Sequence, residues 1–194
     1  MHLKRKNIYI WLIALLHALS TSSAAQETPE SWFADGRAVV ERNKSYRYVN
    51  SEVPHAKNVI LFIGDGMGVS TVTAARILAG QLEGSPGEEN ELFFETFPNI
   101  ALSKTYNTDA QVPDSAGTMT AMTTGIKTDR GIINVNQYVE RGDCNTVSGN
   151  ELQTFLERAE LKGMSTGVVT TARLTHATPA GNYAHTMERN YEDD

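Results

Sequence analysis

The chain has 194 residues, of which 40% are hydrophobic and 21% are charged, with 23 acidic against 17 basic side chains and a formal net charge of -6. This composition excludes wholesale disorder, and fifteen glycines without a collagen period exclude a fibrous protein. The acidic balance argues against a nucleic-acid-binding surface, because phosphate backbones are bound by a basic face. The single cysteine excludes a disulfide-rich scaffold and a cysteine zinc site.

The amino terminus has the three-part layout of a secretory signal. Lys4, Arg5 and Lys6 precede the apolar run 8–19, and small residues follow up to Ser23-Ala24-Ala25. A membrane anchor is the alternative, but the run is shorter than the roughly 20 residues that span a bilayer. We therefore expect residues 1–25 to be a cleaved signal peptide, and residues 26–194 to be exported.

Two features lead us to expect the amino-terminal part of a longer protein. Cys144 stands alone in a chain bound for export, where it has either a free thiol or a partner elsewhere. The chain ends in the polar run Glu192-Asp193-Asp194, with no closing element.

The predicted elements alternate between strands and helices. Helical spacing covers 29–43, 70–78 and 115–124, and Ser148 with Glu151 predicts a capping box for a helix that continues to Gly163. Apolar runs at 58–63, 100–106 and 167–170 predict buried strands. This order predicts an α/β fold with a mainly parallel central sheet and helices on both faces, whose site lies beyond the carboxyl ends of the strands.

The first candidate site follows the strand predicted at 58–63. Gly64-Asp65-Gly66-Met67-Gly68 is not a dinucleotide loop, because the third glycine of that motif falls on Val69 and a carboxylate repels a pyrophosphate. Asp65 fits a cation, since a carboxylate is a hard oxygen ligand. A carboxylate that only supports the turn fits equally well.

The second candidate site is Asp114-Ser115 at the start of the helix predicted at 115–124. A serine hydroxyl there can lie close to an anion bound at the helix amino terminus. The segment is not a G-x-S-x-G elbow, which disfavours a Ser-His-Asp hydrolase. A helix cap is the alternative role for either residue.

Two further candidates follow the strand predicted at 167–170. In extended backbone His176 and Thr178 point to the same side, so both can address one metal site. Arg189 is a candidate bidentate clamp for phosphate. Their alternatives are a surface loop with an incidental histidine and a solvated arginine.

Together these segments closely resemble the alkaline phosphatase family. The resemblance covers 58–78, 97–125 and 163–189, and its specific motifs are Asp65-Gly-Met-Gly-Val-Ser-Thr, Val112-Pro-Asp-Ser, and Val168-Val-Thr-Thr through His176-Ala-Thr-Pro-Ala-Gly. It implies that residues 26–194 are the amino-terminal part of one catalytic domain. It also implies hydrolysis of phosphate monoesters, by a protein that is a homodimer when full length. Met119 departs from the motif, which has glycine or alanine there.

The resemblance implies a role for each candidate at a site with two zinc ions and one magnesium ion. Ser115 matches the nucleophile that becomes phosphorylated and contacts zinc. Asp65 matches a carboxylate shared by zinc and magnesium, Thr178 a magnesium ligand, and His176 a position close to magnesium. Arg189 matches the arginine that binds the substrate phosphate, and Asp114 the carboxylate that orients it.

The resemblance also places several metal ligands, and the partner of Cys144, beyond residue 194. We therefore expect the chain alone to be inactive. A noncatalytic secreted fragment that binds metal or phosphate weakly is the alternative, and a nucleotide-binding module is disfavoured by Asp65 and Val69. Export can lead to the periplasm or the cell exterior, with or without a membrane tether.

Overall fold

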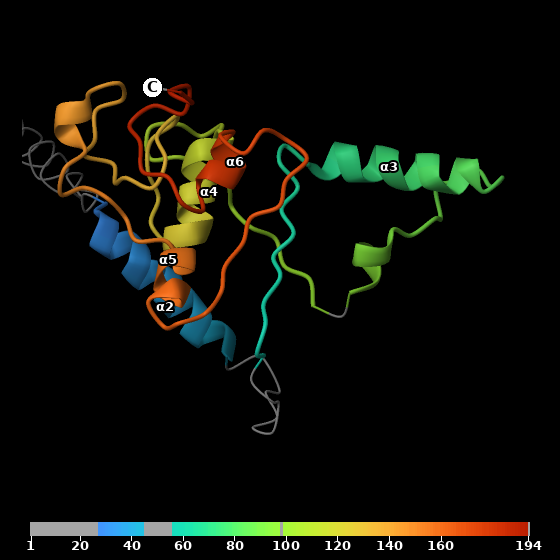
Figure 1. Cartoon of the computed structure of the whole chain (residues 1–194). Helices are drawn as coiled ribbons and strands as arrows, with labels where there is room; N and C mark the ends of the chain where they lie inside the picture. Colours follow the sequence, from blue (N-terminus) through green and yellow to red (C-terminus); the bar gives the residue numbers. More distant parts are fainter. Residues whose placement is uncertain (1–26, 45–55, 98, 194) are drawn as a thin grey trace, which may run out of the picture.

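The protein is described by a computed structural model covering residues 27–44, 56–97 and 99–193. Its helices are α2 (Pro29–Lys44), α3 (Val69–Leu82), α4 (Ser115–Thr124), α5 (Phe155–Glu160) and α6 (Ala177–Ala180), with 3-10 helices η1 (Phe93–Thr96) and η2 (Cys144–Thr146) (Figure 1). Within the described residues, no helix has the length and apolar character needed to cross a membrane. The predicted signal peptide lies outside these ranges.

Three helices confirm the sequence predictions. The structure has helices α2, α3 and α4 where the spacing predicted 29–43, 70–78 and 115–124. α4 begins after Asp114, whose carboxylate accepts the Gly117 amide, and it ends at Gly125 in the left-handed conformation with φ 80°. These end signals are local in sequence, which explains why the bounds of α4 could be predicted.

The capping box predicted at Ser148 and Glu151 is wrong. Glu151 instead accepts a hydrogen bond from the Gly149 amide at 2.7 Å. The capping box is formed by Thr154, which directly precedes α5, and Glu157, the third residue of that helix. The side chain of each accepts a hydrogen bond from the backbone amide of the other. Both pairs have the same spacing, but only the second pair directly precedes helical residues.

The strands predicted at 58–63, 100–106 and 167–170 are not formed in the described part of the chain. These segments are extended and exposed, with Phe62 90%, Leu102 97% and Val169 99% exposed. A strand needs a neighbour that supplies the ladder of backbone hydrogen bonds, and an apolar run by itself specifies only an extended backbone. Within the described residues, β-type pairing is limited to three isolated bridges, at Asn107–Ala110, Ile133–Thr186 and Val135–Glu151.

The core lies around α4, which packs against α5 and α6. One cluster joins Ala116 and Ile133 to residues of α6, and a second joins Ile132, Val135 and Val139 to Met187. The segment 129–131 leads into this core through Gly131, at φ 82°. The core thus combines one helix with a chain segment that runs beside it.

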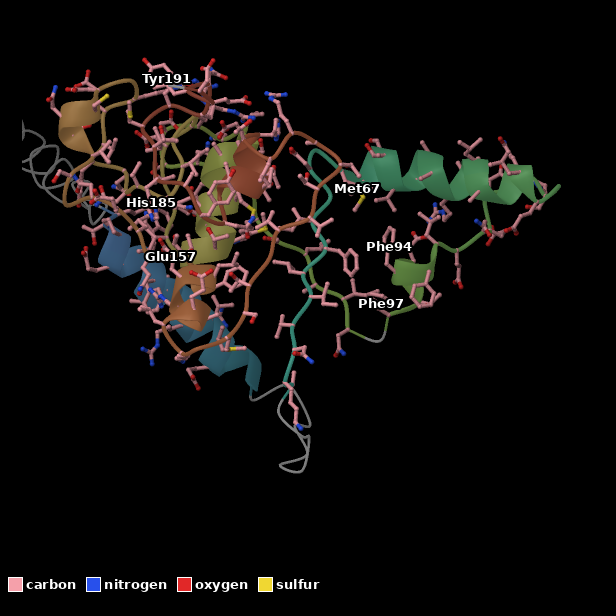
Figure 2. The ribbon with its side chains drawn as sticks, in the orientation of Figure 1. Met67, Phe94, Phe97, Glu157, His185 and Tyr191 are labelled. Carbon is pink, nitrogen blue, oxygen red and sulfur yellow. The ribbon has the colours of Figure 1, made fainter. Side chains whose placement is uncertain are left out.

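A second part of the molecule extends away from this core. α3 and the segment that follows it project from the remaining elements (Figure 1). Figure 2 shows Met67, Phe94 and Phe97 on that side, far from Glu157, His185 and Tyr191. An ion pair of 3.3 Å between Arg76 and Glu95 connects α3 to η1.

α2 docks on the core through Trp32. The Trp32 indole donates to Gln137 Oε1 at 3.0 Å, and its ring meets the Tyr106 ring edge-on at 6.0 Å between centroids. Lys127 Nζ lies 3.8 Å from the centroid of Tyr106, a cation–π contact. Through these contacts Trp32 anchors α2 on the core.

Candidate active site

The start of α4 positions Ser115. Asp114 has an extended backbone, with φ -110° and ψ 170°, and Ser115 is the first residue of the helix. The amino terminus of a helix presents amide groups without intrahelical partners and a partial positive charge. Ser115 is half-buried, and its hydroxyl has no hydrogen-bond partner within the described residues.

Asp114 is both a helix cap and the centre of a hydrogen-bond network. Its Oδ1 accepts from the Gly117 amide at 3.1 Å and from Asn107 Nδ2 at 3.0 Å. Its Oδ2 accepts from the Gly131 amide at 3.0 Å and from Arg189 Nη1 at 3.0 Å. Burial alone raises the pKa of Asp114, but the hydrogen bonds from Gly117, Arg189 and Asn107 outweigh it and hold that pKa below its ordinary value.

Arg189 reaches Asp114 because its backbone runs beside the turn at Gly131. Ile133 and Thr186 exchange backbone hydrogen bonds of 2.8 and 2.9 Å, and the Arg189 amide donates to the Gly131 carbonyl at 2.7 Å. The Arg189 side chain is 21% exposed. A guanidinium whose Nη1 donates to a carboxylate is held in orientation while it keeps further donors.

His176, Thr178 and Asp65 meet at one oxygen atom. Thr178 Oγ1 donates to Asp65 Oδ2 at 2.9 Å, and His176 Nδ1 lies 3.5 Å from the same oxygen. His176 Nδ1 is buried and makes no hydrogen bond. His176 precedes α6 and Thr178 lies inside it, so the extended backbone predicted for this pair is wrong although the two side chains do converge.

His176 connects this group to the phosphate-clamp candidate. Its Nε2 lies 3.4 Å from Arg189 Nη2, while Arg189 Nη1 contacts Asp114. The structure thus brings all the predicted site residues into one region, namely Asp65, Asp114, Ser115, His176, Thr178 and Arg189. Their individual roles remain predictions.

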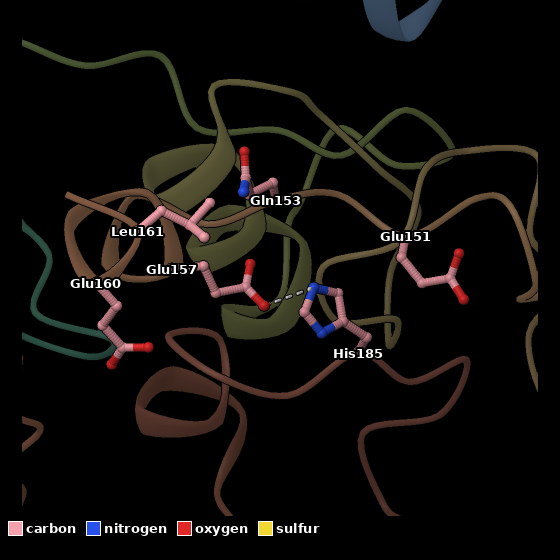
Figure 3. Close-up of a pocket in the computed structure, with 6 residues that line it drawn as sticks. All are labelled: Glu151, Gln153, Glu157, Glu160, Leu161 and His185. Carbon is pink, nitrogen blue, oxygen red and sulfur yellow. Dashed lines mark ion pairs between the residues drawn. The ribbon is translucent and has the colours of Figure 1, made fainter. Parts of the chain in front are cut away.

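A cavity of about 700 Å³ lies elsewhere, beside α5 (Figure 3). It is lined by Glu151, Gln153, Glu157, Glu160, Leu161 and His185. His185 Nε2 lies 3.7 Å from Glu157 Oε1 and 3.0 Å from the Leu152 carbonyl. None of the predicted site residues lines this cavity, and its acidic rim is unsuited to a phosphate dianion.

Comparison with known proteins decides the family. The family model described as alkaline phosphatase matches residues 56–194, which is more than half of the chain. The chain belongs to the alkaline phosphatase family. Its relatives include the human tissue-nonspecific alkaline phosphatase, 50% identical over 169 residues, which are 87% of this chain and 32% of the relative. The alkaline phosphatase of Gadus morhua is 48% identical over 166 residues, 86% of this chain and 34% of that protein.

The solved structures agree with this family. A cold-active alkaline phosphatase from the psychrophile Shewanella sp. aligns with a TM-score of 0.53 and 32% identity, over 66% of this chain and 29% of that one. The described part of the chain thus has a partial likeness to the alkaline phosphatase fold, although its helices are joined by extended segments without strands. The chain spans about a third of the length of the curated relatives it matches.

The side chains around Asp65 fit part of a metal site. Carboxylate and hydroxyl oxygens from Asp65 and Thr178 suit magnesium, and the buried Nδ1 of His176 is a polar atom in need of a partner. Zinc sites normally take three or four protein ligands. Within the described ranges, no group of three histidine, cysteine, aspartate or glutamate side chains is placed to hold a metal. Asp65, Thr178 and His176 can therefore supply some of the ligands of a magnesium ion, but they are too few to form a zinc site.

The sequence does not mark two contributors to the network. Gly131 contributes a backbone amide, which leaves no trace in the residue type. Asn107 contributes a side-chain amide from a segment predicted to follow a strand. No motif marks it, because an asparagine in a loop is common for reasons of turn geometry alone.

Proposed function

We propose that the protein hydrolyses phosphate monoesters to an alcohol and inorganic phosphate through a phosphoserine intermediate at Ser115. The observation that carries this proposal is the contact of 3.0 Å between Arg189 and Asp114, the residue next to Ser115. It puts a cationic donor of phosphate-binding geometry beside an unpaired hydroxyl at a helix amino terminus. The family to which the chain belongs supports the reaction class.

In the proposed reaction Ser115 Oγ attacks phosphorus in line, and the bond from phosphorus to the ester oxygen breaks. The proton that the Ser115 hydroxyl loses ends on the leaving alcohol. Water then attacks the phosphoserine, which restores the Ser115 hydroxyl and releases inorganic phosphate. Arg189 binds two phosphate oxygens throughout, and Asp114 holds Arg189 in orientation.

Two zinc ions and one magnesium ion belong to this proposal. Asp65, Ser115, His176 and Thr178 would hold them together with further ligands. When bound, they would supply positive charge and lower the pKa of the serine hydroxyl. Export to the periplasm or the cell exterior, and a homodimer of the full-length protein, are parts of the same proposal.

A noncatalytic role is the second candidate for the chain on its own. It is favoured by the lack of a three-ligand metal group among the described residues. We expect residues 26–194, expressed alone with added zinc and magnesium, to show no turnover of a chromogenic phosphate monoester above that of the Ser115→Ala variant. Robust turnover that depends on Ser115 would contradict this expectation.

The test of the main proposal is a phosphoenzyme trap. The full-length gene product is incubated with labelled monoester and quenched at low pH, and the label is mapped to a peptide. We expect the label on Ser115 and its loss in Ser115→Ala, with metal content unchanged. Ser148→Ala, at an exposed serine, is the matched control and should retain the label. A label on another residue would overturn the proposal.

A second variant separates substrate binding from the nucleophile. Arg189→Ala should weaken binding of substrate and inorganic phosphate together, because alanine leaves the phosphate oxygens to metal and water. Zinc content should stay unchanged. Arg158→Ala on α5 is the control, since Arg158 lies near the Phe33 ring and away from Asp114. Parental inhibition by phosphate in Arg189→Ala would show that the clamp is misassigned.

A further inference from the structure

Asn107 is placed to fix the carboxylate that orients the proposed phosphate clamp. It is 3% exposed, and its Nδ2 donates to Asp114 Oδ1 at 3.0 Å. The other oxygen of Asp114, Oδ2, accepts hydrogen bonds from the Gly131 amide and from Arg189 Nη1. We propose that Asn107 is a positioning residue for phosphate binding, acting through Asp114 on Arg189. This inference rests on the function proposed above.

The geometry divides the donors between the two oxygens of Asp114. Gly117 and Asn107 both donate to Oδ1, so rotation of the carboxylate would break two hydrogen bonds at once. Oδ2 therefore stays directed at Arg189 Nη1. Without Asn107, Oδ1 keeps the Gly117 amide and Oδ2 keeps the Gly131 amide, so the carboxylate plane is held by fewer donors and its alignment with the guanidinium is looser.

The loop that carries Asn107 is fixed without help from its side chain. The backbones of Asn107 and Ala110 exchange hydrogen bonds of 2.9 and 3.3 Å. The Thr108 amide donates to the Thr128 carbonyl at 3.1 Å, and the Thr108 hydroxyl contacts Asp129. Replacing the Asn107 side chain therefore leaves the anchors of the loop in place.

Gly117 provides the room for the Asn107 amide. A Cβ at Gly117 would lie 2.8 Å from Asn107 Oδ1 and 2.9 Å from Nδ2, closer than such atoms approach. Gly117 is helical, so alanine there favours α4 and keeps the amide that donates to Asp114. Gly117→Ala is thus a second way to displace Asn107, by a route that does not weaken the helix.

The experiment measures inhibition of the full-length, zinc- and magnesium-loaded gene product by inorganic phosphate. We expect Asn107→Ala and Gly117→Ala each to raise the inhibition constant about tenfold. In an Arg189→Ala background the same changes should alter it by less than about twofold, because the residue through which they act is gone. Asn136→Ala, which removes a 2.8 Å amide bond to Asn150, is the control and should match the parent.

The outcomes separate this inference from the function on which it rests. Retained turnover in Ser115→Ala overturns the proposed function. Loss of turnover in Ser115→Ala, with parental phosphate inhibition in Asn107→Ala, overturns the positioning role alone. Equal effects of Asn107→Ala with and without Arg189 also overturn it, since a merely structural role is additive. If Asn107→Ala fails to fold, Gly117→Ala decides: parental inhibition by phosphate in Gly117→Ala overturns the positioning role.

Discussion

Similar apolar residues are buried in one region of the molecule and exposed in another. In the body, defined as residues 106–139 and 176–191, Met119, Ile132 and Ile133 are buried to 1% exposure or less. In the arm, defined as residues 56–97 and 99–105, Ile60 is 80% exposed and Phe62 is 90% exposed. The body places a second segment against these three side chains, whereas the described residues supply none for the extended part of the arm. Burial thus follows from a facing partner, and apolar composition alone does not produce it.

Two isoleucine-to-alanine substitutions, one in the body and one in the arm, test this difference most strongly. Ile133→Ala should lower the free energy of unfolding by about 3 kcal/mol, because it opens a cavity in the cluster with Ala116, Ala177 and Ala180. Ile60→Ala should change it by less than about 0.5 kcal/mol. Urea unfolding of residues 26–194, followed by Trp32 fluorescence, measures both. Similar losses at the two positions would mean that the arm is packed in solution.

A second prediction tests how tightly the body is packed. A Cβ at Gly181 would overlap Met119 Cγ, although the backbone at Gly181, with φ -60°, accepts any residue. Gly181→Ala should therefore cost about 2 kcal/mol by overpacking, and clearly less in a Met119→Ala background, where the contact with Cγ is gone and the contact of 3.0 Å with the Met119 Cβ remains. Thermal and urea unfolding of the four proteins give the coupling.

Gly167→Ala is the control for that cycle, since no atom lies within 4 Å of the position that a Cβ would take there. It should leave the unfolding free energy unchanged. If Gly181→Ala costs the same with and without the Met119 side chain, the crowding lies elsewhere.

The smallest expected effect concerns an ion pair at the edge of the body. Arg141 donates to Glu188 at 2.7 and 2.9 Å, and these bonds hold the pKa of Glu188 below its ordinary value. A depressed carboxyl pKa contributes stability above the unfolded-state pKa of about 4.3, and that contribution is lost as pH falls through the folded-state pKa. Glu188→Gln should cost about 0.5 kcal/mol at pH 7.

Unfolding measured from pH 7 down to pH 3 should show the parent and Glu188→Gln converging in acid. Glu140→Gln is the control, because Glu140 forms no ion pair in the described part of the chain. A gap between parent and Glu188→Gln that stays constant with pH would assign the loss to packing.

Helices α2, α3 and α4 could be predicted from sequence because their signals are local. Asp114 caps the amino end of α4, and Gly125 ends the helix in the left-handed conformation. The strand at 58–63 could not be settled in this way, since its existence depends on a distant segment that supplies hydrogen bonds. The capping box shows the same limit. The spacing of Ser148 and Glu151 recurs at Thr154 and Glu157, and only the residues after the second pair form a helix.

The residue types of the site could be predicted, but not the way they are held. Resemblance to the family pointed to Asp114 and Arg189 as partners, and the structure places them 3.0 Å apart. The amide of Gly131 and the side chain of Asn107 complete the shell around Asp114. A backbone donor has no residue signature, and the Asn107 contact depends on clearance over Gly117.

Arg189 is held at both ends, by its amide on the Gly131 carbonyl and by its guanidinium on Asp114. A long side chain normally loses rotamer entropy when it captures an anion, at a cost of about 0.5–1.5 kcal/mol. Here much of that disorder is already removed before any anion arrives. If Arg189 binds an oxyanion as proposed, the binding step causes little further loss of side-chain entropy. Most of that entropy is lost earlier, when the body folds.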